Sequence, residues 1–358
     1  MTRPRSTHVS FYDTPWYHLV NRCVRRAFLC GTDAVTGRCH DHRRAWMVER
    51  LHQLAGVFAV DVAAYAVMSN HYHVVVRVDA ERAAGLSDDE VLERWTSLFT
   101  GSSLVQRYQA GVALLPAELR AVEAQAASFR QRLADLSWFM CVLNEAIARQ
   151  ANAEDGVKGR FWEGRFKSQA LLDEAAILTA MAYVDLNPIR AGMAATPEAS
   201  AQTSVAERIA ELRGDGGCQR ACGADTGRRD TPADAPDLVP PPPWCATLPR
   251  QPLIPFDATA RVAAAIPFGL EDYLELVEAT GRCQRPDKRG SIEARVPRLL
   301  ERLGIKPDAF VEASSTLLQR FGSAVGMPAS LSAACAARQS GYLRGMRMAR
   351  QLVERPAA

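Results

Sequence analysis

The sequence predicts an α+β fold in which helices pack on one face of an antiparallel sheet. Strand-like and helical segments follow one another in the order strand, helix, strand, strand, helices, strand, helix. Two β-branched runs lie close enough in the chain to form a hairpin, and the longest segments are rich in Ala, Leu, Glu, Gln and Arg, which favour helices. A sheet covered by helices is the packing that this order favours.

The first three strands are predicted from alternation and from β-branched or aromatic residues. Residues 15–24 alternate and contain two aromatic side chains. Residues 59–67 and 71–78 are rich in Val and Tyr, and a turn at about residues 68–70 joins them. Such runs, separated by a short polar segment, are typical of a β-hairpin.

The first helices are predicted from apolar residues that recur at helical spacing. Residues 43–56 show this pattern, with apolar side chains three or four positions apart. Residues 88–109 and 116–152 are long and rich in strong helix formers. We expect two long helices there, between the hairpin and the next strand.

A last strand and helix of this part are predicted over residues 159–187. Residues 159–171 form a candidate strand, and Asp173 is a suitable cap for a helix that runs through Tyr183. The helix should end at about Asn187, because Pro188 disfavours helical geometry in the residue before it.

Length and composition predict more than one domain. With 358 residues the chain is too long for one ordinary core. We expect a first domain over residues 1–213, beginning with a flexible arm over 1–14. Residues 214–256 are rich in Gly and contain the four consecutive prolines 240–243, so they are predicted to be a linker. Residues 257–358 regain periodic apolar content and are predicted to form an all-α domain.

The overall composition is that of a globular protein. Hydrophobic residues make up 48%, charged residues 23%, and the net charge is only +3. The chain has nine cysteines, no apolar signal segment near Met1 and no apolar run of membrane-spanning length. We therefore expect a cytoplasmic protein with reduced thiols and no membrane partner. Cys218 and Cys222 could bind zinc, but no second cysteine pair of suitable spacing follows. Cys39 with His40 and His42 raises the same question, and the alternative there is a polar loop that leads into the helix beginning near Arg44.

Two histidines and a tyrosine are the candidate reactive residues. His71 and His73 begin a strand, and since strand side chains alternate, both imidazoles point to one face, as a metal ion requires. Tyr183 and Asn187 lie four residues apart and share a helix face. A metal site beside a positioned phenol indicates phosphoryl transfer with a tyrosine nucleophile. Each residue also has a purely structural interpretation. His71 and His73 could be ordinary strand histidines, Tyr183 could be a core aromatic residue, and Asn187 could simply end the helix.

Three motifs together resemble a known family. They are residues 70–73 (Asn-His-Tyr-His), 159–168 (Gly-Arg-Phe-Trp-Glu-Gly-Arg-Phe-Lys-Ser) and 183–192 (Tyr-Val-Asp-Leu-Asn-Pro-Ile-Arg-Ala-Gly). In this order they resemble the single-tyrosine HUH transposases, whose name describes two histidines around a bulky hydrophobic residue. The REP-associated tyrosine transposases are the most similar branch. The resemblance covers residues 10–195 and leaves out the linker and the C-terminal helices.

The resemblance implies a fold, an activity and a set of ligands. The family core is a ferredoxin-like or RRM-like antiparallel sheet. His71, His73 and Asn187 are implied to hold Mg²⁺ or Mn²⁺, and Tyr183 to attack single-stranded DNA, which yields a 5′-phosphotyrosine link and a free 3′-OH. The implied partner is DNA with hairpins, such as REP-like repeats. The protein would then be cytoplasmic and associated with the nucleoid when it binds DNA. Monomer and homodimer both stay open.

The second motif also suggests how DNA is held. Arg160, Arg165 and Lys167 could contact phosphates, and Trp162 could stack on an unpaired base, since single-strand binders combine cations with aromatic platforms. The alternative is that the aromatic residues belong to the core. Two other functions compete with transposition chemistry. One is a hairpin-binding module that has lost its chemistry, and the other is a metal-dependent nuclease that uses activated water.

Overall fold

The computed structural model describes residues 13–24, 28–33, 36–201, 203–214, 248–259, 261–262, 264–284 and 297–353. Most of the predicted arm and most of the predicted linker, together with Cys218 and Cys222, lie outside the described residues. None of the described helices is long and apolar enough to cross a lipid bilayer.

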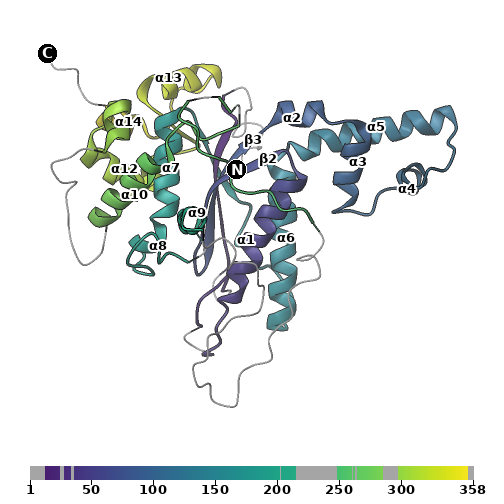
Figure 1. Cartoon of the computed structure of the whole chain (residues 1–358), viewed down its shortest axis with the longest axis horizontal. Coiled ribbons are helices and arrows are strands. Elements are labelled where there is room, and N and C mark those ends of the chain that lie inside the picture. Colours follow the sequence, from purple (N-terminus) through teal and green to yellow (C-terminus); the bar gives the residue numbers. More distant parts are fainter. Residues whose placement is uncertain are drawn as a thin grey trace.

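The described chain contains a five-stranded sheet in the order β2-β3-β1-β4-β5, seen near the centre of Figure 1. The first four strands pair antiparallel, as predicted, whereas the short β5 pairs parallel with β4. Of the candidate strand over residues 159–171, only the last five residues form β4. The strands are β1 (Trp16–Arg22), β2 (Val60–Val67), β3 (His71–Val78), β4 (Lys167–Leu171) and β5 (Ala324–Val325).

Helices account for most of the remaining described residues. The helices are α1 (His42–Val57), α2 (Ala80–Gly85), α3 (Asp88–Thr96), α4 (Ser103–Gln109), α5 (Pro116–Leu133), α6 (Leu136–Asp155), α7 (Glu174–Asp185), α8 (Asn187–Arg190), α9 (Ser204–Leu212), α10 (Leu270–Gln284), α11 (Arg298–Leu303), α12 (Pro307–Arg320), α13 (Pro328–Ala337) and α14 (Met346–Leu352). The two long helices expected over 88–109 and 116–152 are each broken in two. The reason is internal capping: Ser102 caps α4, and the Asp135 carboxylate accepts hydrogen bonds from the first backbone N–H groups of α6.

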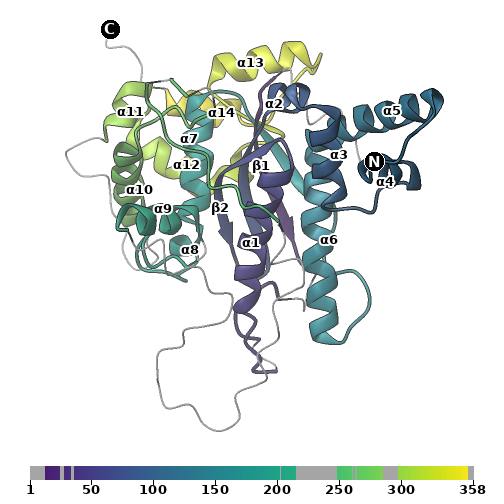
Figure 2. The ribbon, with the colours of Figure 1, turned by 45° about the vertical axis from the view of Figure 1, so that its right-hand side comes forward.

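Helices cover both faces of the sheet. The Tyr72 hydroxyl donates a hydrogen bond to Asn144 Oδ1 on α6 at 2.8 Å, whereas the His73 ring lies 5.3 Å from the Tyr183 ring on α7. Because neighbouring residues of a strand point to opposite faces, α6 and α7 lie on opposite sides of the sheet. Figures 1 and 2 show α1 with α6 on one side and α7 on the other. The predicted α+β class is confirmed, but the expectation of helices on one face is too narrow.

The C-terminal part packs directly on the sheet and on α7. Helix α12 contacts α7, and Ala170 N donates a hydrogen bond to Ser323 O at 2.9 Å beside β5. The buried apolar residues of both parts form one continuous core. The described residues of this part are mostly helical, but the region predicted to be all-α also contributes the short strand β5 to the sheet. The domain boundaries drawn from the sequence stay a prediction.

Helix α7 is held at both ends by carboxylates, a partly buried one at its start and a fully buried one at its end. The predicted cap is confirmed at its start, where the Asp173 side chain accepts from Ala176 N at 2.9 Å. At its end, Asp185 is fully buried and accepts hydrogen bonds from the Ser204 and Tyr273 hydroxyls. These bonds link α7 to α9 and α10, so the helix that carries Tyr183 has a fixed position over the sheet.

Candidate functional site

The histidine face of the sheet is defined by strand register. His73 of β3 lies opposite Val20 of β1, and Val20 lies opposite Lys167 of β4. Residues that pair directly share a face, and so do residues two positions along a strand. His18 and His71 therefore point to the same face as His73. This face is the one that α7 covers.

Three imidazoles and one phenol meet on this face. The His71 and His73 rings lie 5.0 Å apart between centroids, and the His18 and His73 rings stack at 5.2 Å. The Tyr183 ring packs edge-on against His73 at 5.3 Å and against His18 at 5.7 Å. The structure thus brings together the histidine strand and the tyrosine helix, which are more than 100 residues apart in the sequence.

An open cavity of about 530 Å³ lies in front of these side chains. Its charged lining is mainly basic, with Arg22, Arg165 and Lys167 against a single acidic residue, Glu163. All four of these charged side chains are exposed to solvent. The cavity is lined by Val20, Asn21, Arg22, His71, His73, Glu163, Gly164, Arg165, Lys167, Tyr183 and Leu318. It therefore combines the candidate reactive residues with cations that suit an anionic ligand.

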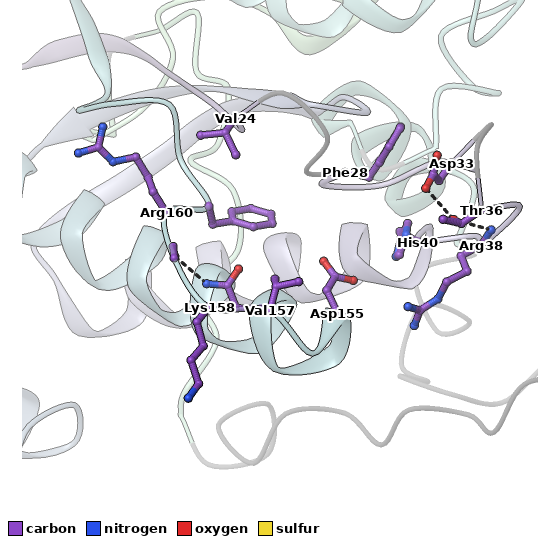
Figure 3. A pocket seen from close by; sticks show the side chains of 13 residues that line it. Val24, Phe28, Asp33, Thr36, Arg38, His40, Asp155, Val157, Lys158 and Arg160 are labelled. Atoms are coloured by element: carbon purple, nitrogen blue, oxygen red, sulfur yellow. Dashed lines mark hydrogen bonds between the residues drawn. The ribbon is translucent and has the colours of Figure 1, made fainter.

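Two of the residues proposed to contact DNA lie elsewhere. Trp162 is only 8% exposed, donates its indole N–H to Asn144 O at 2.8 Å and packs on Tyr72, on the face opposite the histidines. Arg160 lines a separate cavity of about 290 Å³ together with Phe28 and His40 (Figure 3). Only Arg165 and Lys167 of that set line the same cavity as Tyr183.

Asn187 lies close to the position predicted for it, just beyond α7. It begins α8, is 7% exposed, and its Nδ2 is buried without a hydrogen-bond partner. It does not line the open cavity. The predicted helix end is confirmed within two residues, because α7 ends at Asp185 and Pro188 lies in the first turn of the next helix.

Burial keeps the three imidazoles uncharged at neutral pH. It lowers the pKa of His18 and of His71 to about 4, and the pKa of His73 falls well below its ordinary value. The chief cause for each is loss of solvation, and the charges of nearby Arg22 and Arg190 add to it for His71 and His73. A neutral imidazole has the free lone pair that a metal ligand needs.

The phenol has a cationic neighbour that the sequence analysis did not single out. The Arg190 guanidinium lies 4.3 Å from the centre of the Tyr183 ring. Burial raises the pKa of Tyr183, and the charge of Arg190 opposes this rise. Arg190 is held there by donating to Ser314 O at 2.8 Å. Arg190 belongs to the motif over residues 183–192, so the sequence could have indicated it. Its distance from the Tyr183 ring, however, depends on the fold.

A divalent cation is compatible with the residues present. Within the described chain, no group of three His, Cys, Asp or Glu side chains is arranged to hold a metal ion. The buried polar atoms of the described residues that have no hydrogen-bond partner include His73 Nε2 and the Asn187 amide nitrogen. Buried polar groups are normally satisfied, so an unpaired imidazole nitrogen and an unpaired amide are the pattern that an additional ligand would complete. The donors would then be two imidazoles and one amide rather than carboxylates.

Similarity to known proteins is weak. No family model matches the chain, and no curated protein matches it. Among solved structures, a REP-associated tyrosine transposase bound to a REP hairpin is similar, with 14% sequence identity and a TM-score of 0.29. The match covers 55% of this chain and 79% of that one. A TM-score of this size supports no functional conclusion.

Proposed function

We propose that this protein is a metal-dependent transesterase that nicks and rejoins single-stranded, hairpin-bearing DNA. The main supporting observation is that Tyr183 and the pair His71 and His73 line one basic cavity, with the Tyr183 ring 5.3 Å from that of His73. The three motifs that resemble single-tyrosine HUH transposases support the same chemistry. On this proposal the protein works in the cytoplasm, at the nucleoid, on repeats of the REP type.

His71, His73 and Asn187 are the proposed ligands of Mg²⁺ or Mn²⁺. The unpaired His73 Nε2 and the unpaired Asn187 amide support this assignment. An amide presents either its oxygen or its nitrogen after a simple flip, so Asn187 can offer an oxygen to a cation. When bound, a divalent cation would polarise the scissile phosphate and stabilise the charge on the leaving oxygen.

Tyr183 is the proposed nucleophile. Its Oη forms a bond to phosphorus while the bond from phosphorus to the 3′ oxygen breaks; the phenolic proton leaves to solvent and the 3′ oxygen takes one up. The product is a tyrosyl ester of the 5′ phosphate, which keeps the bond energy, so the reverse reaction rejoins strands without a nucleotide cofactor. The charge of Arg190 favours the ionised phenol. Arg165 and Lys167 line the same cavity and are the residues proposed to hold neighbouring phosphates.

The test is formation of a covalent adduct between the protein and DNA. Purified protein is incubated with Mn²⁺ and a labelled single-stranded hairpin oligonucleotide from repeats flanking its own gene, then separated on a denaturing gel. We expect a shifted band with the unaltered protein, and none with Tyr183→Phe or after chelation of the metal. Tyr342→Phe is the control, because that phenol is 71% exposed and does not line the cavity.

The outcomes separate the competing functions. An adduct that persists in Tyr183→Phe would disprove the assignment of the nucleophile. Cleavage without an adduct would indicate a nuclease that uses activated water, and hairpin binding without cleavage would indicate a module that has lost its chemistry.

A further inference from the structure

Two buried residues behind His73 have no role in the chemistry described so far. His18 on β1 is 0% exposed and Gln169 on β4 is 4% exposed. Their side chains connect His73 to the C-terminal part of the protein through consecutive hydrogen bonds. Burying a polar side chain is costly unless its partners are well placed, so a continuous buried chain of this kind calls for an explanation.

The donor and acceptor of each hydrogen bond in this series are fixed by the bond farthest from His73, between Gln169 and Gly322. The Gln169 amide nitrogen donates to Gly322 O at 2.8 Å, and a backbone carbonyl can only accept a hydrogen bond. The amide nitrogen must therefore face Gly322, which leaves Gln169 Oε1 facing His18. A flipped amide would place two oxygens against each other at Gly322.

The remaining hydrogen bonds follow from that orientation. His18 Nδ1 lies 3.0 Å from Gln169 Oε1, and since an amide oxygen only accepts, His18 Nδ1 carries the hydrogen. A neutral imidazole has one N–H, so His18 Nε2 is an acceptor. It lies 3.0 Å from His73 Nδ1, which must therefore be the donor. His73 Nε2 is left with a bare lone pair.

Two further observations agree with this assignment. His73 Nε2 is buried and has no hydrogen-bond partner, as a lone pair reserved for another ligand would be. Both rings are buried, His18 at 0% and His73 at 1% exposed, and burial disfavours the charged form of an imidazole. Both rings are therefore neutral at neutral pH. The His71 Nδ1 likewise lies 2.8 Å from an amide side chain, at Asn70 Oδ1.

We propose that His18 and Gln169 are positioning residues that hold His73 in the tautomer with hydrogen on Nδ1, so that its Nε2 lone pair faces a divalent cation. This inference rests on the metal site of the proposed function. It also assigns a role to the C-terminal part. Gly322, 153 residues beyond Gln169, provides the carbonyl at which this series of hydrogen bonds begins. Partners of this kind fix the orientation and tautomer of a metal-binding histidine.

The test measures tautomers in the metal-free protein. The chain has seven histidines, so ¹⁵N-histidine labelling gives a tractable spectrum in which single variants assign each ring. We expect His73 to carry its hydrogen on Nδ1. Gln169→Met removes the oxygen acceptor at similar volume, so His18 and His73 should populate both tautomers. Mn²⁺ affinity, measured by calorimetry without DNA, should fall about 10- to 100-fold.

A matched control separates positioning from general loss of stability. Gln53 is also a fully buried glutamine, but it lies on α1, on the opposite side of the sheet from α7. Gln53→Met should lower stability to a similar degree while leaving the His73 tautomer and the Mn²⁺ affinity unchanged.

Two results would overturn the inference. One is a His73 ring with its hydrogen on Nε2 in the unaltered protein, and the other is Gln169→Met with unchanged tautomers and unchanged Mn²⁺ affinity. Failure of the proposed function looks different, since the protein would show the expected tautomer and Mn²⁺ binding but form no DNA adduct. In that case the positioning role stands.

Discussion

Tyr72 and His73 are neighbours on β3, both are buried, and they enter opposite environments. Tyr72 faces α6, where its hydroxyl is bonded to Asn144 and its ring packs on Trp162. His73 faces α7 and an open, basic cavity, and its Nε2 has no partner. On the α6 side the Tyr72 hydroxyl is paired, whereas on the α7 side His73 Nε2 is unpaired beside a cavity. On the proposed function, the histidine face is the side that binds the metal ion and DNA, and an unpaired buried nitrogen there costs some stability until a ligand binds.

The largest effect that would sharpen this comparison is expected from His73→Leu. The variant removes a proposed ligand, so Mn²⁺ affinity should fall more than about 100-fold, a larger decrease than removal of a hydrogen-bond partner of a ligand causes. Stability should change little, about 1 kcal/mol or less, because the absence of the hydrogen bond to His18 and the removal of an unpaired buried nitrogen act in opposite directions. Calorimetry with Mn²⁺ and urea unfolding measure the two quantities. Unchanged Mn²⁺ affinity would contradict the metal assignment.

Substitutions of Tyr72, on the opposite face, should lower stability and leave Mn²⁺ affinity unchanged. Tyr72→Ala leaves a cavity in the core and should lower the free energy of unfolding by about 3–5 kcal/mol. Tyr72→Phe removes only one hydrogen bond and should cost about 1 kcal/mol. Neither variant should alter Mn²⁺ affinity in protein that remains folded. A large decrease of Mn²⁺ affinity in Tyr72→Phe would show that the two faces are not independent.

A smaller effect is expected from the cations of the cavity. Replacing Arg165 and Lys167 together by Gln should weaken binding of a single-stranded oligonucleotide and make it less sensitive to salt. The slope of log affinity against log salt should become shallower by about 0.7 for each phosphate that the protein no longer neutralises. Arg149→Gln is the control, because that exposed arginine lies on α6. An equal change in slope for Arg149→Gln would argue against a DNA path through this cavity.

The smallest effect is expected from an ionic network on the side of the sheet that α1 covers. His52 on α1 and the Tyr65 hydroxyl on β2 both bond to Glu207. The Glu207 hydrogen bond and charge raise the pKa of His52 above 6.5 against the effect of burial, and His52 lowers that of Glu207 below 4.5, also against burial. The His52 contribution is complete below pH 6.5 and disappears as pH rises through its raised pKa. The Glu207 contribution is present above pH 4.5 and disappears as pH falls through its lowered pKa.

Urea unfolding between about pH 4 and pH 9 tests this network. Stability of the unaltered protein should decline on both sides of a maximum, and Glu207→Gln should flatten the curve. Identical pH profiles for the two proteins would contradict the pairing.

Much of the fold could be predicted locally. Alternation predicted β1, β2 and β3, and the Asp173 cap and Pro188 bracketed α7, because period and capping are properties of a few neighbouring residues. The breaks after α3 and α5 were missed, since a long run of helix formers conceals where a side-chain cap begins a new helix. Residues 257–358 were predicted to be helical, but the position of α12 within them was not, although α12 packs on the tyrosine helix.

The sequence by itself determined which residues can carry chemistry and how they are spaced: two imidazoles on one strand face, and a phenol near the end of a helix. Only the tertiary structure decided that Trp162 belongs to the core, that Arg190 lies against Tyr183, and that His18, Gln169 and Gly322 stand behind His73. The physical reason is that these contacts depend on strand register and on packing between segments far apart in the chain. No local pattern of residues encodes them.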